Sequence, residues 1–106
     1  MVIVLFRSRT TDAAGEDYAT MADEMLTRAH TMPGFVDFKS FQAKDGEHLS
    51  VIWWESQETL RQWAIDARHV VAQRLGREKW YQYFRLEIAE VVRSYGFERD
   101  PATGKR

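Results

Sequence analysis

Among the three histidines of this 106-residue chain, His69 is the side chain best suited to acid–base chemistry. Imidazole titrates near neutral pH, so it can remove the proton of a phenolic hydroxyl group, and it can also ligate iron. On an unbroken helix His69 would lie nearly opposite Ala67 and Val71, which favours the alternative of a solvent-facing or capping histidine. His30 and His48 fall at a predicted helix end and strand start, where surface positions are expected.

Four further side chains could hold a flat aromatic molecule beside such a base. Trp63 could stack on the ring, or it could be a core residue between helix and sheet. Trp54 follows Trp53 directly, so the two indoles point to opposite faces of a strand, one toward a pocket and one toward an interface. Arg7 could orient an anionic or phenolic oxygen, or form a structural ion pair. Gln73 could hydrogen-bond a carbonyl group, or simply be exposed.

The composition excludes several classes of function. The net charge is −1 and the basic residues form no dense cluster, so a nucleic-acid partner is not expected. The absence of cysteine excludes disulfides, thiolate catalysis and cysteine-based zinc sites, and no histidine-rich metal motif is present. The apolar start, residues 1–6, is too short for a signal peptide or a membrane span, which predicts a cytoplasmic protein without membrane contact.

The first half of the chain predicts a strand, a helix and a hairpin. Continuous apolarity over residues 2–6 indicates a strand that is covered on both faces. Apolar residues recur at helical spacing over residues 16–32, and Pro33-Gly34 then ends the helix. Two strand patterns, over residues 35–43 and 49–55, flank Asp45-Gly46, a strong signal for a hairpin.

The second half predicts a helical region and a long strand. Ser56 is a suitable N-cap for a helix that carries Trp63, and a second segment over residues 67–75 ends at Gly76. An alternating pattern then predicts a strand over residues 80–95, with Tyr81 and Tyr83 on the same face. Residues 1–97 therefore form one predicted domain, and residues 98–106 form a polar tail.

The element order β-α-β-β-α-β predicts an α+β fold of the ferredoxin-like type, with an antiparallel sheet and two helices on one face. The other face would then expose one of the adjacent indoles, apolar residues of the first strand and several tyrosines. Face-to-face pairing of two sheets removes this apolar patch. The sequence thus predicts a homodimer, in which the long last strand could reach across to the partner chain.

Several stretches resemble the antibiotic biosynthesis monooxygenase family within the dimeric α/β barrels. These stretches, which together span residues 1 to about 97, are Met32-Pro33-Gly34-Phe35, Trp53-Trp54-Glu55-Ser56, residues 63–78, residues 80–91 and Tyr95-Gly96-Phe97. The resemblance implies a pocket between the helices and the sheet of each subunit. Some members of the family oxidise quinols or polyketide phenols with molecular oxygen and no cofactor, whereas others bind and degrade haem.

The haem-degrading pattern can be compared residue by residue. It uses an Asn in the first strand, a Trp on the second helix and an axial His about ten residues later. Trp63 matches the Trp, but Gln73 stands at the axial position and Arg7 at the Asn position. His69, one helical turn before Gln73, is the only nearby substitute ligand. The resemblance therefore favours a protein without a cofactor over one that uses haem.

We expect, on this resemblance, a small monooxygenase that acts on a phenol or quinol-type substrate. Trp63 and Trp54 would form the aromatic slot, His69 would be the base, and Arg7 or Gln73 would be the polar anchor. The alternative is a non-enzymatic dimeric barrel that binds a small aromatic ligand.

Overall fold

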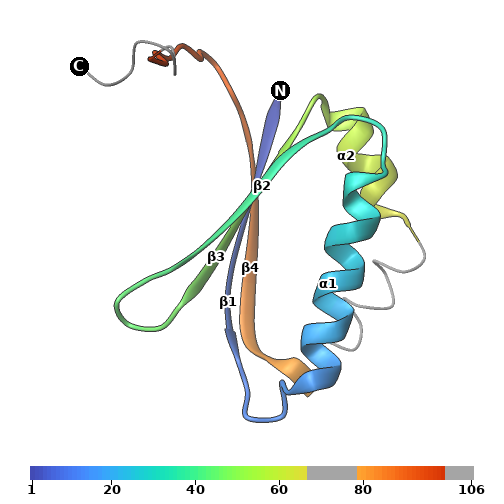
Figure 1. Ribbon diagram of the computed structural model, residues 1–106, viewed down its shortest axis with the longest axis vertical. Coiled ribbons are helices and arrows are strands. Elements are labelled where there is room, and N and C mark those ends of the chain that lie inside the picture. Colours follow the sequence, from blue (N-terminus) through green and yellow to red (C-terminus); the bar gives the residue numbers. More distant parts are fainter. Residues whose placement is uncertain (67–78, 100–106) are drawn as a thin grey trace.

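A computed structural model describes residues 1–66 and 79–99 of the chain. The elements follow the predicted order and are β1 (Val2–Thr10), α1 (Glu16–His30), β2 (Phe35–Gln42), β3 (His48–Trp54), α2 (Gln57–Ala64) and β4 (Tyr81–Glu90). The strands form one antiparallel sheet in the order β2-β3-β1-β4, and both helices lie on the same side of it (Figure 1). This is the predicted ferredoxin-like arrangement.

The boundaries of β1 and α1 differ from those predicted. β1 continues through the polar residues up to Thr10, because β3 and β4 pair with it on both sides, as far as His48 and Tyr81 respectively. Hydrogen bonding in the ladder therefore outweighs side-chain polarity. α1 ends at His30 instead of residue 32, and the Thr31 hydroxyl closes its last turn by donating to the Arg28 carbonyl at 2.7 Å.

The last strand is shorter than predicted. Regular pairing ends at Glu90 because β1, its only neighbour in the sheet, begins at Val2. The Val91 amide still donates to the Met1 carbonyl at 3.0 Å. Residues 92–99 then run on as an extended arm that leaves the sheet (Figure 1).

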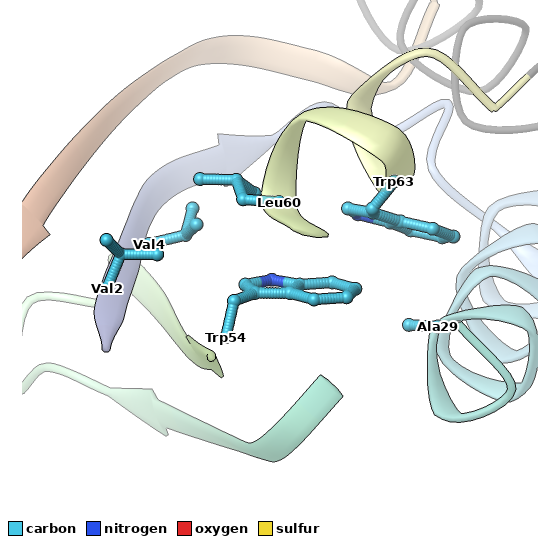
Figure 2. Packing of buried hydrophobic residues seen from close by; sticks show 6 residues of the cluster. All are labelled: Val2, Val4, Ala29, Trp54, Leu60 and Trp63. Atoms are coloured by element: carbon cyan, nitrogen blue, oxygen red, sulfur yellow. The ribbon is translucent and has the colours of Figure 1, made fainter. Parts of the chain in front are cut away.

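The two faces of the sheet are both rich in apolar residues. We call the side covered by α1 and α2 the helix-facing side and the other side the open face. The helix-facing core consists of Val2, Val4, Ala29, Trp54, Leu60 and Trp63 (Figure 2). Trp53 points to the open face, as the alternation of a strand requires. The predicted division of the two adjacent indoles between the two faces is therefore confirmed.

One predicted face assignment is wrong. Tyr81 and Tyr83 were expected on the same face, but a register shift between Arg9 and Thr10 interrupts the alternation where β1 meets β4. Tyr81 therefore turns to the helix-facing side, where its hydroxyl lies 3.5 Å from that of Tyr18 on α1, while Tyr83 stays on the open face. Such irregularities re-aim side chains and have no signature in the alternation itself.

The start of α2 depends on two local features. Ser56 caps the helix as predicted: its hydroxyl accepts from the Thr59 amide at 3.2 Å, and the Thr59 hydroxyl accepts from the Ser56 amide at 3.2 Å. Gly34, with a φ of 84°, lets the turn before β2 pass directly against this cap. A Cβ atom at position 34 would collide with the Thr59 side chain.

We predict that Gly34→Ala lowers the free energy of unfolding by about 2–4 kcal/mol, because it combines left-handed strain with a steric clash. Gly46→Ala is the matched control, because Gly46 also has a positive φ of 94° but meets only the end of Arg9, at 3.4 Å. The control should lose only the strain, about 1–2 kcal/mol. Urea unfolding of both variants measures the difference, and equal losses would contradict the proposed contact between Gly34 and Thr59.

Candidate functional site

Trp54 and Trp63 come together on the helix-facing side of the sheet. Trp54 is the last residue of β3 and Trp63 lies on α2, and their rings stack with centroids 6.0 Å apart and planes 25° apart (Figure 2). The edge of Phe35 meets Trp54 at 5.6 Å and 88°. The structure thus joins the two residues predicted to form an aromatic slot.

The space around this pair is filled by the protein itself. Trp54 is 0% and Trp63 5% exposed, and Met25 and Met32 pack against the same core. The indole Nε1 of Trp54 is buried without a hydrogen-bond partner among the described residues. A buried donor without a partner costs about 1–3 kcal/mol.

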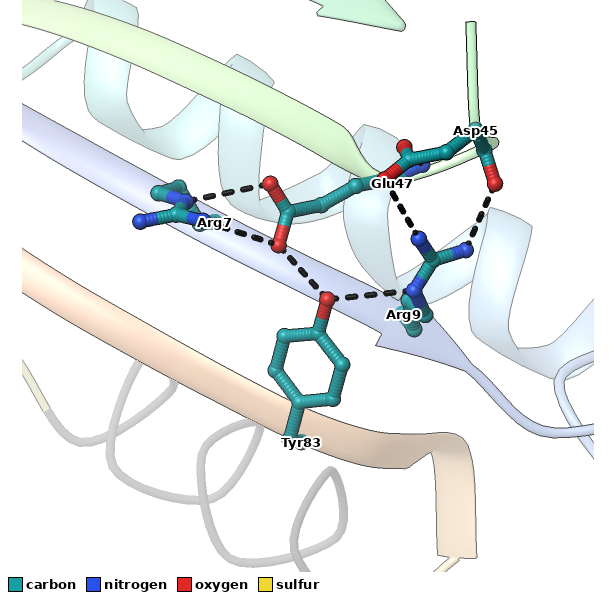
Figure 3. A network of polar contacts seen from close by, with 5 residues as sticks. All are labelled: Arg7, Arg9, Asp45, Glu47 and Tyr83. Carbon is teal, nitrogen blue, oxygen red and sulfur yellow. Dashed lines mark hydrogen bonds and ion pairs between the residues drawn. The ribbon is translucent and has the colours of Figure 1, made fainter. Parts of the chain in front are cut away.

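Arg7 does not join the tryptophan pair. It lies on the open face, where its guanidinium meets the Glu47 carboxylate at 3.0 and 3.4 Å (Figure 3). Trp63 covers the opposite side of the sheet. Arg7 and Trp63 of one chain therefore cannot line a common pocket.

The open face carries a polar network around Glu47. Tyr83 donates to Glu47 at 2.6 Å and accepts from Arg9 Nε at 3.1 Å, while Arg9 also pairs with Asp45 at 3.0 Å (Figure 3). The hydrogen bond from Tyr83, and then that from Arg7, holds the pKa of Glu47 below its ordinary value. The same carboxylate raises the pKa of Tyr83. The network joins β1, β4 and the hairpin, which is a structural role for Arg7.

A second aromatic cluster lies on the helix-facing side, toward the other end of β1. Its rings belong to Phe6, Tyr18, Trp80, Tyr81 and Phe84. Phe6 stacks on Phe84 at 5.5 Å, and Tyr18 meets Tyr81 edge to face at 5.8 Å and 87°. This cluster was not predicted, because strict alternation along residues 80–95 would place Tyr81 on the other face.

Apolar surface beside this cluster is open. Leu86 and Ile88 lie on the helix-facing side of β4, opposite Phe6 and Val4 of β1, yet they are 42% and 48% exposed. The helix-facing side thus has a filled end at the tryptophan pair and an accessible apolar strip along β4. A surface hollow of about 460 Å³ also runs along α1, and its described lining residues all belong to α1 and its C-cap residue Thr31.

The remaining predicted site residues, His69 and Gln73, lie outside the described residues. His30 and His48 are exposed, as predicted. Within residues 1–66 and 79–99 no three His, Asp or Glu side chains gather as potential metal ligands. In the same ranges, no helix is both long and apolar enough to cross a membrane.

The fold and the layout of the helix-facing side define a class, the α+β proteins with a ferredoxin-like sheet. The sequence model of the antibiotic biosynthesis monooxygenase family matches residues 1–75, so the chain belongs to that family. The uncharacterised protein YqjZ of Bacillus subtilis is 29% identical over 83 residues, which cover 78% of this chain and 73% of that protein. A jasmonate monooxygenase of Pyricularia oryzae is 27% identical over 97 residues, which cover 89% of this chain but only 45% of that enzyme.

Solved structures agree on the fold. Rv0793 from Mycobacterium tuberculosis superimposes with a TM-score of 0.77 at 14% identity, covering 90% of this chain and 98% of that one. SnoaB from Streptomyces nogalater, a cofactor-independent oxygenase, gives 0.72 at 12% identity, with 88% and 94% covered. At these identities the likeness concerns the fold alone.

We predict that Glu47→Gln lowers stability at neutral pH and that this loss shrinks in acid. A carboxylate whose folded pKa is depressed stabilises the fold above its unfolded pKa, and this contribution disappears as the pH falls through the folded pKa. Unfolding free energies of both proteins, measured at neutral pH and well below the ordinary glutamate range, give the difference. Glu55→Gln, a change at an exposed carboxylate outside the network, is the control. A Glu47→Gln deficit that is independent of pH would refute the role of its charge.

Proposed function

We propose that this chain is a cytoplasmic monooxygenase that acts on an aromatic phenol or quinol-type substrate without a cofactor. Support comes from membership of the family and from two relatives, one named a jasmonate monooxygenase and one a cofactor-independent oxygenase. The observation that carries the proposal is the accessible strip of Leu86 and Ile88 next to a cluster of aromatic rings on the helix-facing side.

The chemistry requires no external reductant. A quinol and O₂ give a hydroxyquinone and water, so the substrate supplies all the electrons while one oxygen atom enters the product. A deprotonated quinol can itself reduce oxygen, which leaves the protein three tasks: binding the ring, removing a proton and excluding water. The apolar strip and the neighbouring rings serve the first and third tasks.

Each site residue predicted from the sequence has a role in this proposed reaction. Trp54 and Trp63 would close the inner end of the site with their stacked rings. His69 is the proposed base and Gln73 the proposed polar anchor. Arg7 is the less suitable anchor, because Glu47 holds its guanidinium on the open face.

One observation favours the alternative, a non-enzymatic barrel that binds a small aromatic ligand. Trp54 and Trp63 pack on each other and on the methionines of the core, so the predicted slot between them is occupied by the protein. A ligand would then rest on the β4 strip without being enclosed by the indoles. Turnover separates the two functions.

We further propose that the open face is the interface of a homodimer. Ile3, Leu5, Leu49 and Trp53 are half-buried on this face in a single chain, and Phe41 is 52% exposed. Arg85 and Glu87 lie on it too, and within the described residues no ion pair joins them to another side chain. A second copy would cover the apolar residues and supply partners for the charges.

The extended arm after β4 is a second argument for a homodimer. Val92, Tyr95 and Phe97 are 94%, 90% and 84% exposed in the single chain, and the arm leaves the sheet entirely (Figure 1). Large apolar side chains so fully exposed on one short segment are unusual for a monomer. Packing on a second copy would remove them from water.

The enzymatic proposal predicts saturable oxygen uptake with 1,4-dihydroxynaphthalene, above the rate of its autoxidation in buffer. His69→Ala should reduce this turnover on the order of 100-fold or more, as expected for loss of a general base. His48→Ala, a change at an exposed histidine at the start of β3, should leave it unchanged. Saturable binding of several quinols without any uptake would instead establish the binding-only function.

The dimer proposal predicts a sedimentation mass of twice 12.5 kDa. Trp53→Lys places a charge on the open face and should weaken association on the order of 100-fold or more, because an unpaired charge would be buried. Gln62→Lys, which adds the same charge on the exposed side of α2, should not. A wild-type protein that stays monomeric at high concentration would rule out this interface.

A further inference from the structure

We propose that the hydroxyl groups of Tyr18 and Tyr81 form a binding subsite for an oxygen atom of the ring ligand, either a carbonyl or a phenolic oxygen. This inference rests on the proposed function, because it assumes that an oxygen-bearing aromatic molecule occupies the helix-facing side. The subsite lies on the helix-facing side, at the end of the sheet far from the Trp54–Trp63 pair.

Two layers of the fold bring these hydroxyl groups together. Tyr18 lies in the first turn of α1 and Tyr81 is the first residue of β4, where the register shift turns it toward the helix. Their oxygens are 3.5 Å apart, at the outer limit of a hydrogen bond. Neither hydroxyl has another hydrogen-bond partner among the described residues. The pair therefore holds two weakly engaged donors that can converge on one acceptor oxygen.

The surroundings strengthen such a bond. The rings of Phe6, Trp80 and Phe84 pack around the two tyrosines at centroid distances of 5.5–5.6 Å. A hydrogen bond in surroundings of low polarity is electrostatically stronger than one in water. The same rings offer faces and edges to an aromatic ligand, so ring and oxygen would be recognised side by side.

The chemistry of the pair is that of a donor. Burial, and then the hydrogen bond with Tyr18, raises the pKa of Tyr81 far above its ordinary value, so its hydroxyl keeps its proton at any physiological pH. A neutral phenol donates to a carbonyl or phenolate oxygen and removes no proton from it. The pair would orient the substrate and leave the proton transfer to another group.

The ligand would bind on the accessible apolar strip along β4. The ring of Phe84 meets that of Tyr81 with centroids 5.6 Å apart, and Leu86 and Ile88 continue the same face of β4 beyond it. Both aliphatic side chains are accessible. A fused ring lying on this strip would direct a ring oxygen at one end toward the two hydroxyls.

The test compares two ring probes of similar size, 1,4-naphthoquinone with carbonyl oxygens and naphthalene without them. Affinities of the full-length chain are measured by equilibrium dialysis. We expect Tyr81→Phe, and separately Tyr18→Phe, to weaken naphthoquinone binding about five- to tenfold, as for loss of one hydrogen bond. Naphthalene binding should stay the same, because the rings remain. Tyr83→Phe is the matched control, on the same strand but on the open face, and should change neither affinity.

Three outcomes would overturn the subsite: wild-type protein that does not bind naphthoquinone, variants that bind it as well as wild type, or variants that lose both probes equally. The last result would mean that the tyrosines only support the fold, and thermal unfolding of each variant checks this directly. Oxygen uptake is measured on the same samples. Selective loss of naphthoquinone binding in a protein without turnover would preserve the subsite and refute only the monooxygenase.

Discussion

The constraint on which this structure depends is a four-stranded sheet with apolar side chains on both faces and helices on only one. Trp53 and Trp54 express it most simply, because adjacent strand residues must point to opposite sides. Trp54 is fully buried beneath α2, whereas Trp53 is only half-buried in a single chain. The proposed second copy would cover the open face and the apolar arm after β4, which would leave the helix-facing side for the proposed small-molecule site.

The helix-facing side is divided between stability and function. At the end where β1 begins, the stacked pair Trp54–Trp63 fills the space between the layers and anchors α2. Toward the other end, the rings of Phe6, Trp80 and Phe84 pack around the Tyr18–Tyr81 pair. Between the two ends, Leu86 and Ile88 remain accessible along the edge strand β4. The tryptophan pair packs α2 against the sheet, while the accessible strip along β4 would provide surface for the proposed ligand. A fold that many proteins share can thus acquire a particular substrate through a few side chains at one end.

Much of the fold could be predicted from the sequence because it depends on local patterns. Periodicity identified the order of strands and helices, and Ser56 identified the start of α2. The end of β4 could not be predicted, because a strand ends where its partner does, and the alternating pattern continues past Glu90. The side of Arg7 was equally undetermined, since a single strand does not reveal which of its faces the helices cover.

For the candidate site, the residue types indicated which side chains could bind an aromatic ring, but the sequence did not reveal which face of the sheet each one lies on. Trp54 and Trp63 were predicted to form an aromatic slot, and their rings do come together, but they stack on each other in the core. The tyrosine pair was missed because a register shift of the backbone reversed the face of Tyr81. Such a shift depends on how β1 and β4 align, a long-range property that no local sequence pattern encodes.

The most direct test of this account is to locate a bound aromatic ring on the sheet. Intermolecular NOEs from 1,4-naphthoquinone to the methyl groups of methyl-labelled protein distinguish the two faces. The account predicts contacts with Leu86 and Ile88 on the helix-facing side and none with Ile3 and Leu5 on the open face. Contacts with Ile3 and Leu5 instead would contradict both the assignment of the ligand site and that of the interface.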